Sequence, residues 1–207
     1  MSRTEHWDSV YASRTDDEVS WTQHDPTLSL ALIREVCPAG RIIDVGGGTS
    51  VLSERLLDEG HSVAVLDIST TALVRAKQRL GARANRVRWI VADITGEPDL
   101  ETVDVWHDRA VFHFLTDPAD RAAYRRLLSR TVPPGGYVII ATFALDGPDK
   151  CSGLPVHRYD PPQLIAELGE EFEFLKSVPE IHHTPWGKAQ SFQYSAFRRI
   201  QQGTCAS

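Results

Sequence analysis

The segment Arg41-Ile-Ile-Asp-Val-Gly-Gly-Gly-Thr-Ser50 decides the fold. A β-branched apolar run ends in three glycines, and residues 49–58 follow with the apolar spacing of a helix. Glycines between a strand and a helix let the backbone pass close beneath a ligand, where a Cβ would collide. The alternative interpretation is a tight strand-to-helix turn that binds nothing.

The same alternation of strand and helix continues along the chain. Further helices are predicted over residues 70–80, capped by Ser69 and ended by Gly81, and from Asp117-Pro118 to about residue 131. Another begins at Asp160-Pro161. Further strands are predicted over residues 61–66, 87–91, 103–107, 137–143, 172–178 and 190–198, with a loop over 179–189 between the last two. This order predicts an α/β fold: a Rossmann-like, doubly wound, mostly parallel seven-stranded sheet with an antiparallel edge hairpin.

Composition narrows the classes of function. The chain has 22 basic and 28 acidic side chains and a net charge of −6, which offers no footprint for nucleic acid. The polar N-terminus and the lack of a long apolar run predict no membrane segment. The three cysteines are odd in number and match no zinc spacing, so a cytoplasmic protein without a metal site is expected. We expect a helical N-terminal lid or extension over 1–40, one domain over 41–200 and a flexible tail over 201–207.

Three successive strands each deliver an aspartate to the same edge of the sheet. Asp44 ends the first strand, Asp67 the second and Asp93 the third. Ligands of open α/β sheets bind at that edge, and Asp67 follows Asp44 by the interval expected of an acid that binds ribose hydroxyls. Each aspartate alone could cap a helix. The three together favour a nucleoside pocket.

The glycine loop indicates which nucleoside is bound. From Gly46 it reads Gly-x-Gly-x-x-Val51, so the third small residue of a dinucleotide fingerprint is missing. Asp44 would also repel a pyrophosphate. The pattern Asp-x-Gly-x-Gly instead resembles motif I of class I S-adenosylmethionine-dependent methyltransferases, whose ligand has no phosphate and carries an ammonium and a sulfonium.

This resemblance covers roughly residues 40–145 and implies a class I methyltransferase domain with S-adenosylmethionine as cofactor. It implies that Asp67 holds the ribose hydroxyls, with Ile68 against the adenine, and that Asp93 accepts from the adenine amino group. A fourth motif is similar to Val103–His113 and places His107 at the cofactor. The implied cofactor site comprises Asp44, Gly46, Gly47, Gly48, Asp67, Ile68, Asp93, Ile94 and His107.

Candidates for the transfer step follow the fourth strand and lie in the extension. Methyl transfer needs alignment above all, and a base only when the nucleophile arrives protonated. The candidates after the strand are His107, Asp108, Arg109 and His113. The alternatives are a packed core histidine for His113 and a simple Asp108–Arg109 ion pair. Tyr11 or Trp21 could cover the sulfonium with an aromatic face, or could simply dock the extension.

The acceptor is predicted to be a small molecule whose nucleophile is a thiol, an oxygen or a nitrogen. The protein itself is predicted to be a monomer or a homodimer. We place acceptor specificity in residues 144–159 and 181–187, which include Cys151, His182, His183 and Trp186. The alternative for both segments is a plain surface loop, and a Cys/His metal site there has no diagnostic spacing. The alternative functions are a protein-lysine methyltransferase with an open acidic groove and a non-catalytic cofactor-binding module. A dinucleotide oxidoreductase is least favoured.

Overall fold

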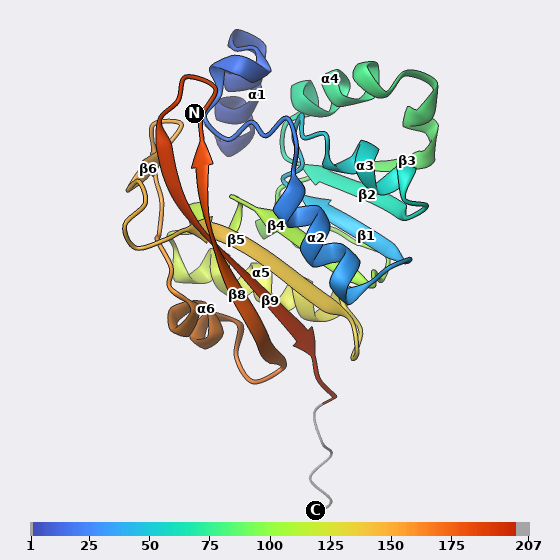
Figure 1. Cartoon of the computed structure of the whole chain (residues 1–207), viewed down its shortest axis with the longest axis vertical. Helices are drawn as coiled ribbons and strands as arrows, with labels where there is room; N and C mark the ends of the chain where they lie inside the picture. The colour runs from blue at the N-terminus through green and yellow to red at the C-terminus, as the bar shows by residue number, and fades with distance from the viewer. Residues whose placement is uncertain (1, 202–207) are drawn as a thin grey trace, which may run out of the picture.

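A computed structural model describes residues 2–201 as a seven-stranded sheet in the order β3-β2-β1-β4-β5-β9-β8 (Figure 1). The first five strands of this order run parallel, and β9 and β8 add an antiparallel hairpin at the edge. The strands are β1 (Arg41–Val45), β2 (Ser62–Asp67), β3 (Val87–Val91), β4 (Val105–Arg109), β5 (Tyr137–Phe143), β8 (Phe172–His183) and β9 (Ala189–Arg199). The predicted fold is confirmed.

Helices cover both faces of the sheet. One face carries α2 (Thr27–Val36), α3 (Leu52–Asp58) and α4 (Thr70–Leu80), and the other carries α5 (Pro118–Thr131) and α6 (Pro161–Leu168). Side chains alternate between the two cores as a pleated strand requires: Ile42 packs into the first core and Ile43 into the second. Figure 1 shows α2 in front of the sheet and α5 behind it.

Local signals in the sequence set the helix ends. The Ser69 hydroxyl accepts from the Ala72 amide, and Gly81 ends α4 with φ +58°. Asp117 caps α5 ahead of Pro118, and Asp160 forms a full capping box at the start of α6. These predicted helix boundaries are confirmed. The predicted helix over 49–58 begins later, at Leu52, because residues 49–51 turn on hydrogen bonds to Gly47 and to the Ser50 side chain.

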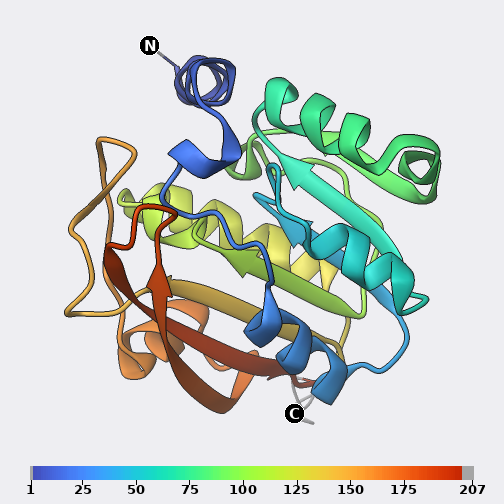
Figure 2. The ribbon, with the colours of Figure 1, turned by 45° about the horizontal axis from the view of Figure 1, so that its top comes forward.

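The N-terminal segment divides into two parts. Helix α1 (Arg3–Ser13) and the short 3-10 turn η1 (Asp16–Glu18) lie beyond the carboxyl ends of the strands (Figure 2). Helix α2 instead buries Leu30, Leu32 and Ile33 in the core of the sheet. Residues up to about 26 therefore form the segment over the rim, which we call the roof segment (residues 2–26).

Two predicted stretches differ from the structure. Strand β4 runs over 105–109 rather than 103–107, because its pairing with β1 begins at Val105 and Ile42. The predicted loop over 179–189 is mostly strand: the β8–β9 ladder continues to His183 and Ala189. A minor hairpin, β6 (Lys150–Cys151) with β7 (Leu154–Pro155), forms within the predicted loop over 144–159. Three further 3-10 turns are η2 (Gly81–Arg86), η3 (Ile94–Gly96) and η4 (Phe112–Phe114).

No helix within residues 2–201 combines the length and the apolar character needed to cross a bilayer. Gln201 is the only residue of the predicted tail that the structure describes, and residues 202–207 lie outside the described part.

Candidate active site

A cleft lies at the carboxyl ends of β1 to β4, under the roof segment. It has two adjacent regions that share Tyr11, Trp21, Gly46 and Arg109. The first, which we call the nucleoside region, is lined mainly by the ends of β2 and β3 and by η4. The second, which we call the loop region, follows the glycine loop towards α2 and α3. They hold about 820 and 980 Å³ of space respectively, counting the part open to solvent.

The glycine loop is shaped for close approach. Gly46 and Gly48 have φ angles of +66° and +51°, a region that side-chain-bearing residues rarely adopt. A Cβ on Gly46 would lie 2.0 Å from a Val111 methyl, and one on Gly48 would lie 2.4 Å from the Tyr11 hydroxyl. Glycine is therefore required at both positions by the close packing of Val111 and Tyr11. Gly46 and Gly47 border the cleft, so this part of the loop backbone lies beside the space for a ligand.

Asp67 is positioned to bind a ligand hydroxyl. Its carboxylate accepts the Gly48 amide at 2.8 Å and the Ser69 amide at 2.8 Å, which fixes its orientation at the end of β2. A carboxylate has about four acceptor positions, so two remain. Burial raises the pKa of Asp67 to about 6. The two hydrogen bonds lower this pKa, and repulsion from Asp44 and Asp8 raises it further. The residue borders the nucleoside region.

The neighbouring residues complete a slot for a flat ring. Ile68, Asp93 and Ile94 all line the nucleoside region, where apolar side chains flank a carboxylate. One Asp93 oxygen accepts from the backbone and hydroxyl of Thr95, and the other lies 3.7 Å from the Arg3 guanidinium. Asp93 and the two isoleucines thus lie side by side at the rim, and the contact of Asp93 with the adenine amino group stays a prediction.

Behind the glycine loop runs a buried chain of hydrogen bonds. His107 joins Asp44 through Nδ1 at 2.8 Å and the Ser29 hydroxyl through Nε2 at 2.9 Å. Ser29 lies 3.5 Å from the hydroxyl of Tyr194, which accepts from Arg109 Nε at 2.9 Å. The order aspartate–histidine–serine matches a hydrolase triad, but Ser29 is fully buried. The chain therefore orients Asp44 and His107, which both border the loop region.

Aromatic side chains form the roof of the cleft. The Trp7 ring meets Trp21 at 5.7 Å and Phe114 at 5.1 Å, and Tyr11 meets Trp21 at 6.0 Å, all edge to face. These four residues all line the nucleoside region. The sequence placed Tyr11 and Trp21 here. Their rings dock the roof segment and also line the cleft, and the covering of a sulfonium by either ring stays a prediction.

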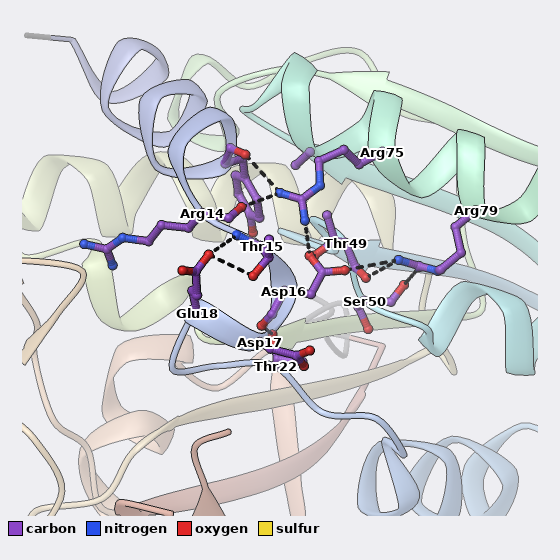
Figure 3. Close-up of polar contacts among 12 residues, drawn as sticks. Arg14, Thr15, Asp16, Asp17, Glu18, Thr22, Thr49, Ser50, Arg75 and Arg79 are labelled. Atoms are coloured by element: carbon purple, nitrogen blue, oxygen red, sulfur yellow. Dashed lines mark hydrogen bonds and ion pairs between the residues drawn. The ribbon is translucent and has the colours of Figure 1, made fainter. Parts of the chain in front are cut away.

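Polar contacts fasten the roof segment to α4 and to the glycine loop (Figure 3). The Asp16 carboxylate accepts from the Arg75 guanidinium at 2.6 Å and from the Thr49 hydroxyl at 2.8 Å. Arg75 also donates to the carbonyls of Tyr11 and Arg14, at 2.9 and 2.8 Å. Arg79 lies 3.8 Å from Asp16 and donates to the Thr49 carbonyl. Asp16 thus joins the roof to the loop that would hold the cofactor.

The structure places Asp108 and His113 away from both regions of the cleft. Asp108 is fully buried and accepts from the Tyr124 hydroxyl and from the amides of Val111 and Phe112. Burial raises its pKa to about 6. The hypothesis of an Asp108–Arg109 ion pair is wrong, because successive strand residues point to opposite faces and Arg109 pairs with Glu180 instead.

His113 is a packed histidine. It is fully buried, its ring stacks near Phe143 and Phe114, and its Nδ1 accepts the Phe143 amide at 3.3 Å. Burial lowers its pKa to about 3, with the nearby Arg109 charge adding to the effect. Such an imidazole stays neutral and is a poor proton acceptor at neutral pH. The position favours the packing alternative over a catalytic role.

The segments assigned to acceptor specificity contribute one residue to the cleft. Cys151 lines the nucleoside region, and burial raises the pKa of its thiol to about 11. His182 is buried in β8 and bonds the Ser20 carbonyl at 2.7 Å, whereas Trp186 is 57% exposed at the hairpin tip. Within residues 2–201 no cluster of three or more His, Cys, Asp or Glu side chains could hold a metal ion.

Two aromatic lining residues, Trp7 and Phe114, were not assigned to the site from the sequence. Trp7 could have been found, since it precedes Tyr11 by four residues and so shares its helix face. Arg109 was a candidate for the transfer step, but nothing in the sequence placed it at the junction of the two regions, and Phe114 carries no signal. Their roles depend on which strand face and which turn they occupy.

The fold and this rim define a nucleoside-cofactor domain with a glycine loop, a ribose-type aspartate and an aromatic roof. Residues 42–136 match the family described as methyltransferase domain. This segment is a class I S-adenosylmethionine-dependent methyltransferase domain, and the cofactor of such a domain is S-adenosylmethionine. The residues fit this cofactor: each Asp67 oxygen accepts one backbone amide and keeps one acceptor position for a ribose hydroxyl.

Three comparisons place the chain among its relatives. An uncharacterized methyltransferase of Mycobacterium tuberculosis is 34% identical over 116 residues, 55% of this chain and 56% of the relative. The chain spans about half the length of the curated relatives it matches first. A structure from echinomycin biosynthesis, described for converting a disulfide bond into a thioacetal group, has a TM-score of 0.80 at 20% identity, covering 98% of this chain and 94% of its own. The third is Burkholderia thailandensis 1,6-didemethyltoxoflavin-N1-methyltransferase, with bound 1,6-didemethyltoxoflavin and S-adenosylhomocysteine. Its TM-score is 0.69 at 19% identity, covering 96% and 84%.

Proposed function

We propose that the protein transfers the methyl group of S-adenosylmethionine to a small-molecule acceptor. The observation that carries this proposal is the covered cleft: three aromatic residues of the roof segment lie over the rim and leave a partly open, largely apolar space beside the glycine loop. Two structural neighbours belong to small-molecule chemistry: one converts a disulfide bond into a thioacetal group during echinomycin biosynthesis, and the other methylates 1,6-didemethyltoxoflavin. Both support the same class of acceptor.

The proposed cofactor contacts follow from the geometry of the rim. Asp67 binds the ribose hydroxyls through its two free acceptor positions. Ile68 and Ile94 enclose the adenine, whose amino group donates to Asp93. Asp44, held by His107, lies in the loop region and suits the amino group of the methionine part.

The chain's own contribution to transfer is alignment and exclusion of water. When bound, the cofactor supplies an electrophilic methyl group on a sulfonium. Tyr11 and Trp21 border both regions of the cleft and present aromatic faces to a cation there. Trp7 and Phe114 close the outer wall against water. We assign no proton transfer to His113 or Asp108, since both are buried away from the cleft. An acceptor that reacts deprotonated, such as a thiolate, fits this machinery.

A protein-lysine acceptor would need the cleft open to a peptide. The hypothesis of such an enzyme predicted an open acidic groove, whereas the roof segment is bonded down by Asp16 and Arg75. This covering favours a small acceptor.

The test is a screen for S-adenosylhomocysteine release with S-adenosylmethionine and panels of thiols, phenols and amines, alongside an unfolded-protein and peptide panel. We expect turnover with at least one small molecule and none with the peptides. Turnover with lysine peptides alone would contradict the proposal.

A further inference from the structure

Arg109 is a buried cation at the junction of the two cleft regions. It ends β4, lines both regions, and its side chain is only 10% exposed. Its Nε donates to the Tyr194 hydroxyl at 2.9 Å, and Nη1 donates to the Trp21 carbonyl at 3.0 Å. The guanidinium also stacks over the Phe192 ring, with its central carbon 4.4 Å from the ring centre. Strand β9 and the roof segment therefore hold the group in one orientation.

The guanidinium has donors left over. It carries five N–H groups, and the contacts with Tyr194 and Trp21 use two of them. Within residues 2–201, Nη2 has no hydrogen-bond partner although it is buried. A buried charged donor without an acceptor is costly, and native structures rarely retain one without a purpose. The fork of Arg109 is thus preorganised for an acceptor that the protein itself does not supply.

The charges around Arg109 leave it incompletely neutralised. Glu180 is its only carboxylate within 4 Å among the described residues, at 3.7 Å from Nη2, and that carboxylate also accepts from Gln23. His182 stays neutral because burial, with the Arg109 charge, lowers its pKa to about 4. Cys151 also stays neutral as a thiol. Among the described residues, the one carboxylate near Arg109 is thus too distant for a hydrogen bond, and the positive charge can interact with a ligand anion.

We propose that Arg109, which lines both regions of the cleft, anchors a carboxylate there through its guanidinium group. The inference rests on the proposed function, since the carboxylate belongs either to the methionine part of the cofactor or to the acceptor. Planar carboxylates match the arginine fork, and hydrogen bonds between charged groups are the strong ones. Arg109 would then select which ligands bind productively in this cleft.

The experiment compares wild type with Arg109→Gln and Arg109→Lys by isothermal titration. Two nucleosides are used: S-adenosylhomocysteine, and 5′-methylthioadenosine, which keeps the adenosine and lacks the amino-acid group. Two probes are also titrated, with and without saturating S-adenosylhomocysteine: indole-3-carboxylate and indole-3-carboxamide. The lysine variant keeps the charge but not the fork, and serves if the glutamine variant does not fold.

Two results support the proposal and identify the source. If the cofactor supplies the carboxylate, Arg109→Gln weakens S-adenosylhomocysteine by roughly ten- to a hundredfold and 5′-methylthioadenosine by less than about twofold. If the acceptor supplies it, both nucleosides bind the variant normally. Wild type then prefers the carboxylate probe to the amide by about tenfold or more, and the variant loses that preference. Arg109→Lys should lie between wild type and Arg109→Gln.

Glu180→Gln is the matched control. Because Glu180 competes for the same cation, its removal should tighten the carboxylate-bearing ligand by a few fold. If Arg109 only fastens the roof segment, Arg109→Gln and Glu180→Gln lower the affinity for all four ligands to the same extent, and this result overturns the proposal. Unchanged nucleoside affinity in Arg109→Gln without any acid-over-amide preference in wild type also overturns it. If wild type binds no nucleoside at all, the proposed function fails, and the probe arm without cofactor still decides the role of Arg109.

Discussion

The charge state of Asp67 makes cofactor binding and stability respond to pH in opposite directions. Only the ionised carboxylate accepts from both ribose hydroxyls while it holds the Gly48 and Ser69 amides. Since its pKa in the free protein is about 6, lowering the pH from 7 to 5 reduces the ionised fraction from about 0.9 to about 0.1. We therefore predict that affinity for S-adenosylhomocysteine falls about tenfold over this interval.

Stability of the free protein should change the other way. The folded state raises the pKa of Asp67 from 3.8 to about 6, so it binds a proton more tightly than the unfolded chain does. By linkage, the free energy of unfolding falls by about 1.3 kcal/mol for this group as pH rises from 5 to 7, which is the upper part of a total loss of about 3 kcal/mol. Asp108 has a pKa of about 6 for the same reason of burial and adds to the trend.

Titration calorimetry and urea unfolding at pH 5, 6 and 7 measure the two effects. Asp108→Asn is the control: it should reduce the pH dependence of unfolding and keep the tenfold change in affinity. Asp67→Asn should abolish the change in affinity. An affinity that is flat with pH in wild type, or that stays pH-dependent in Asp67→Asn, would refute the role given to Asp67.

Three further predictions concern the roof and the buried histidine. Asp16→Asn removes the negative charge that contacts Arg75, Arg79 and Thr49. The variant should bind S-adenosylhomocysteine several fold more weakly and should be cleaved faster by proteases within residues 14–26. In the control Asp17→Asn, whose exposed side chain pairs with His24, neither property should change. Trp21→Ala should lower the affinity for S-adenosylmethionine more than the affinity for S-adenosylhomocysteine, which has an uncharged sulfur, because an aromatic face stabilises the sulfonium by roughly 0.5–2 kcal/mol. Equal losses would show that Trp21 only docks the roof segment. His113→Ala should lower the free energy of unfolding by about 2–4 kcal/mol, because it leaves a cavity and an unpaired Phe143 amide. Its affinity for S-adenosylhomocysteine should stay within twofold of wild type. A stable variant with impaired binding would contradict the structural role given to His113.

The sheet was predictable because its signals are local. Glycines after residue 45 and Asp-Pro pairs at helix starts fix where elements begin, and alternating apolar residues fix their type. The strand ends brought Asp44, Asp67 and Asp93 to one rim, since parallel strands share an edge. The cofactor side of the cleft could therefore be derived from strand order.

The acceptor side could not be derived in this way. Strand β4 ends two residues later than predicted, so Arg109 lies at its carboxyl end, where it lines the cleft. Sequence patterns locate strand ends no more closely than about two residues. His182 pairs with Gln190 in the β8–β9 ladder, although the polar sequence around it is typical of a loop. Phe114 and Cys151 reach the cleft through a 3-10 turn and a minor hairpin, which depend on tertiary packing.

Isothermal titration of the purified protein with S-adenosylmethionine, with NAD as the control ligand, tests the central claim most directly. We predict micromolar binding of S-adenosylmethionine, no binding of NAD, and a loss of S-adenosylmethionine affinity of at least tenfold in Asp67→Ala. Binding of NAD alone, or an Asp67→Ala variant with unchanged affinity for S-adenosylmethionine, would contradict the account of this site.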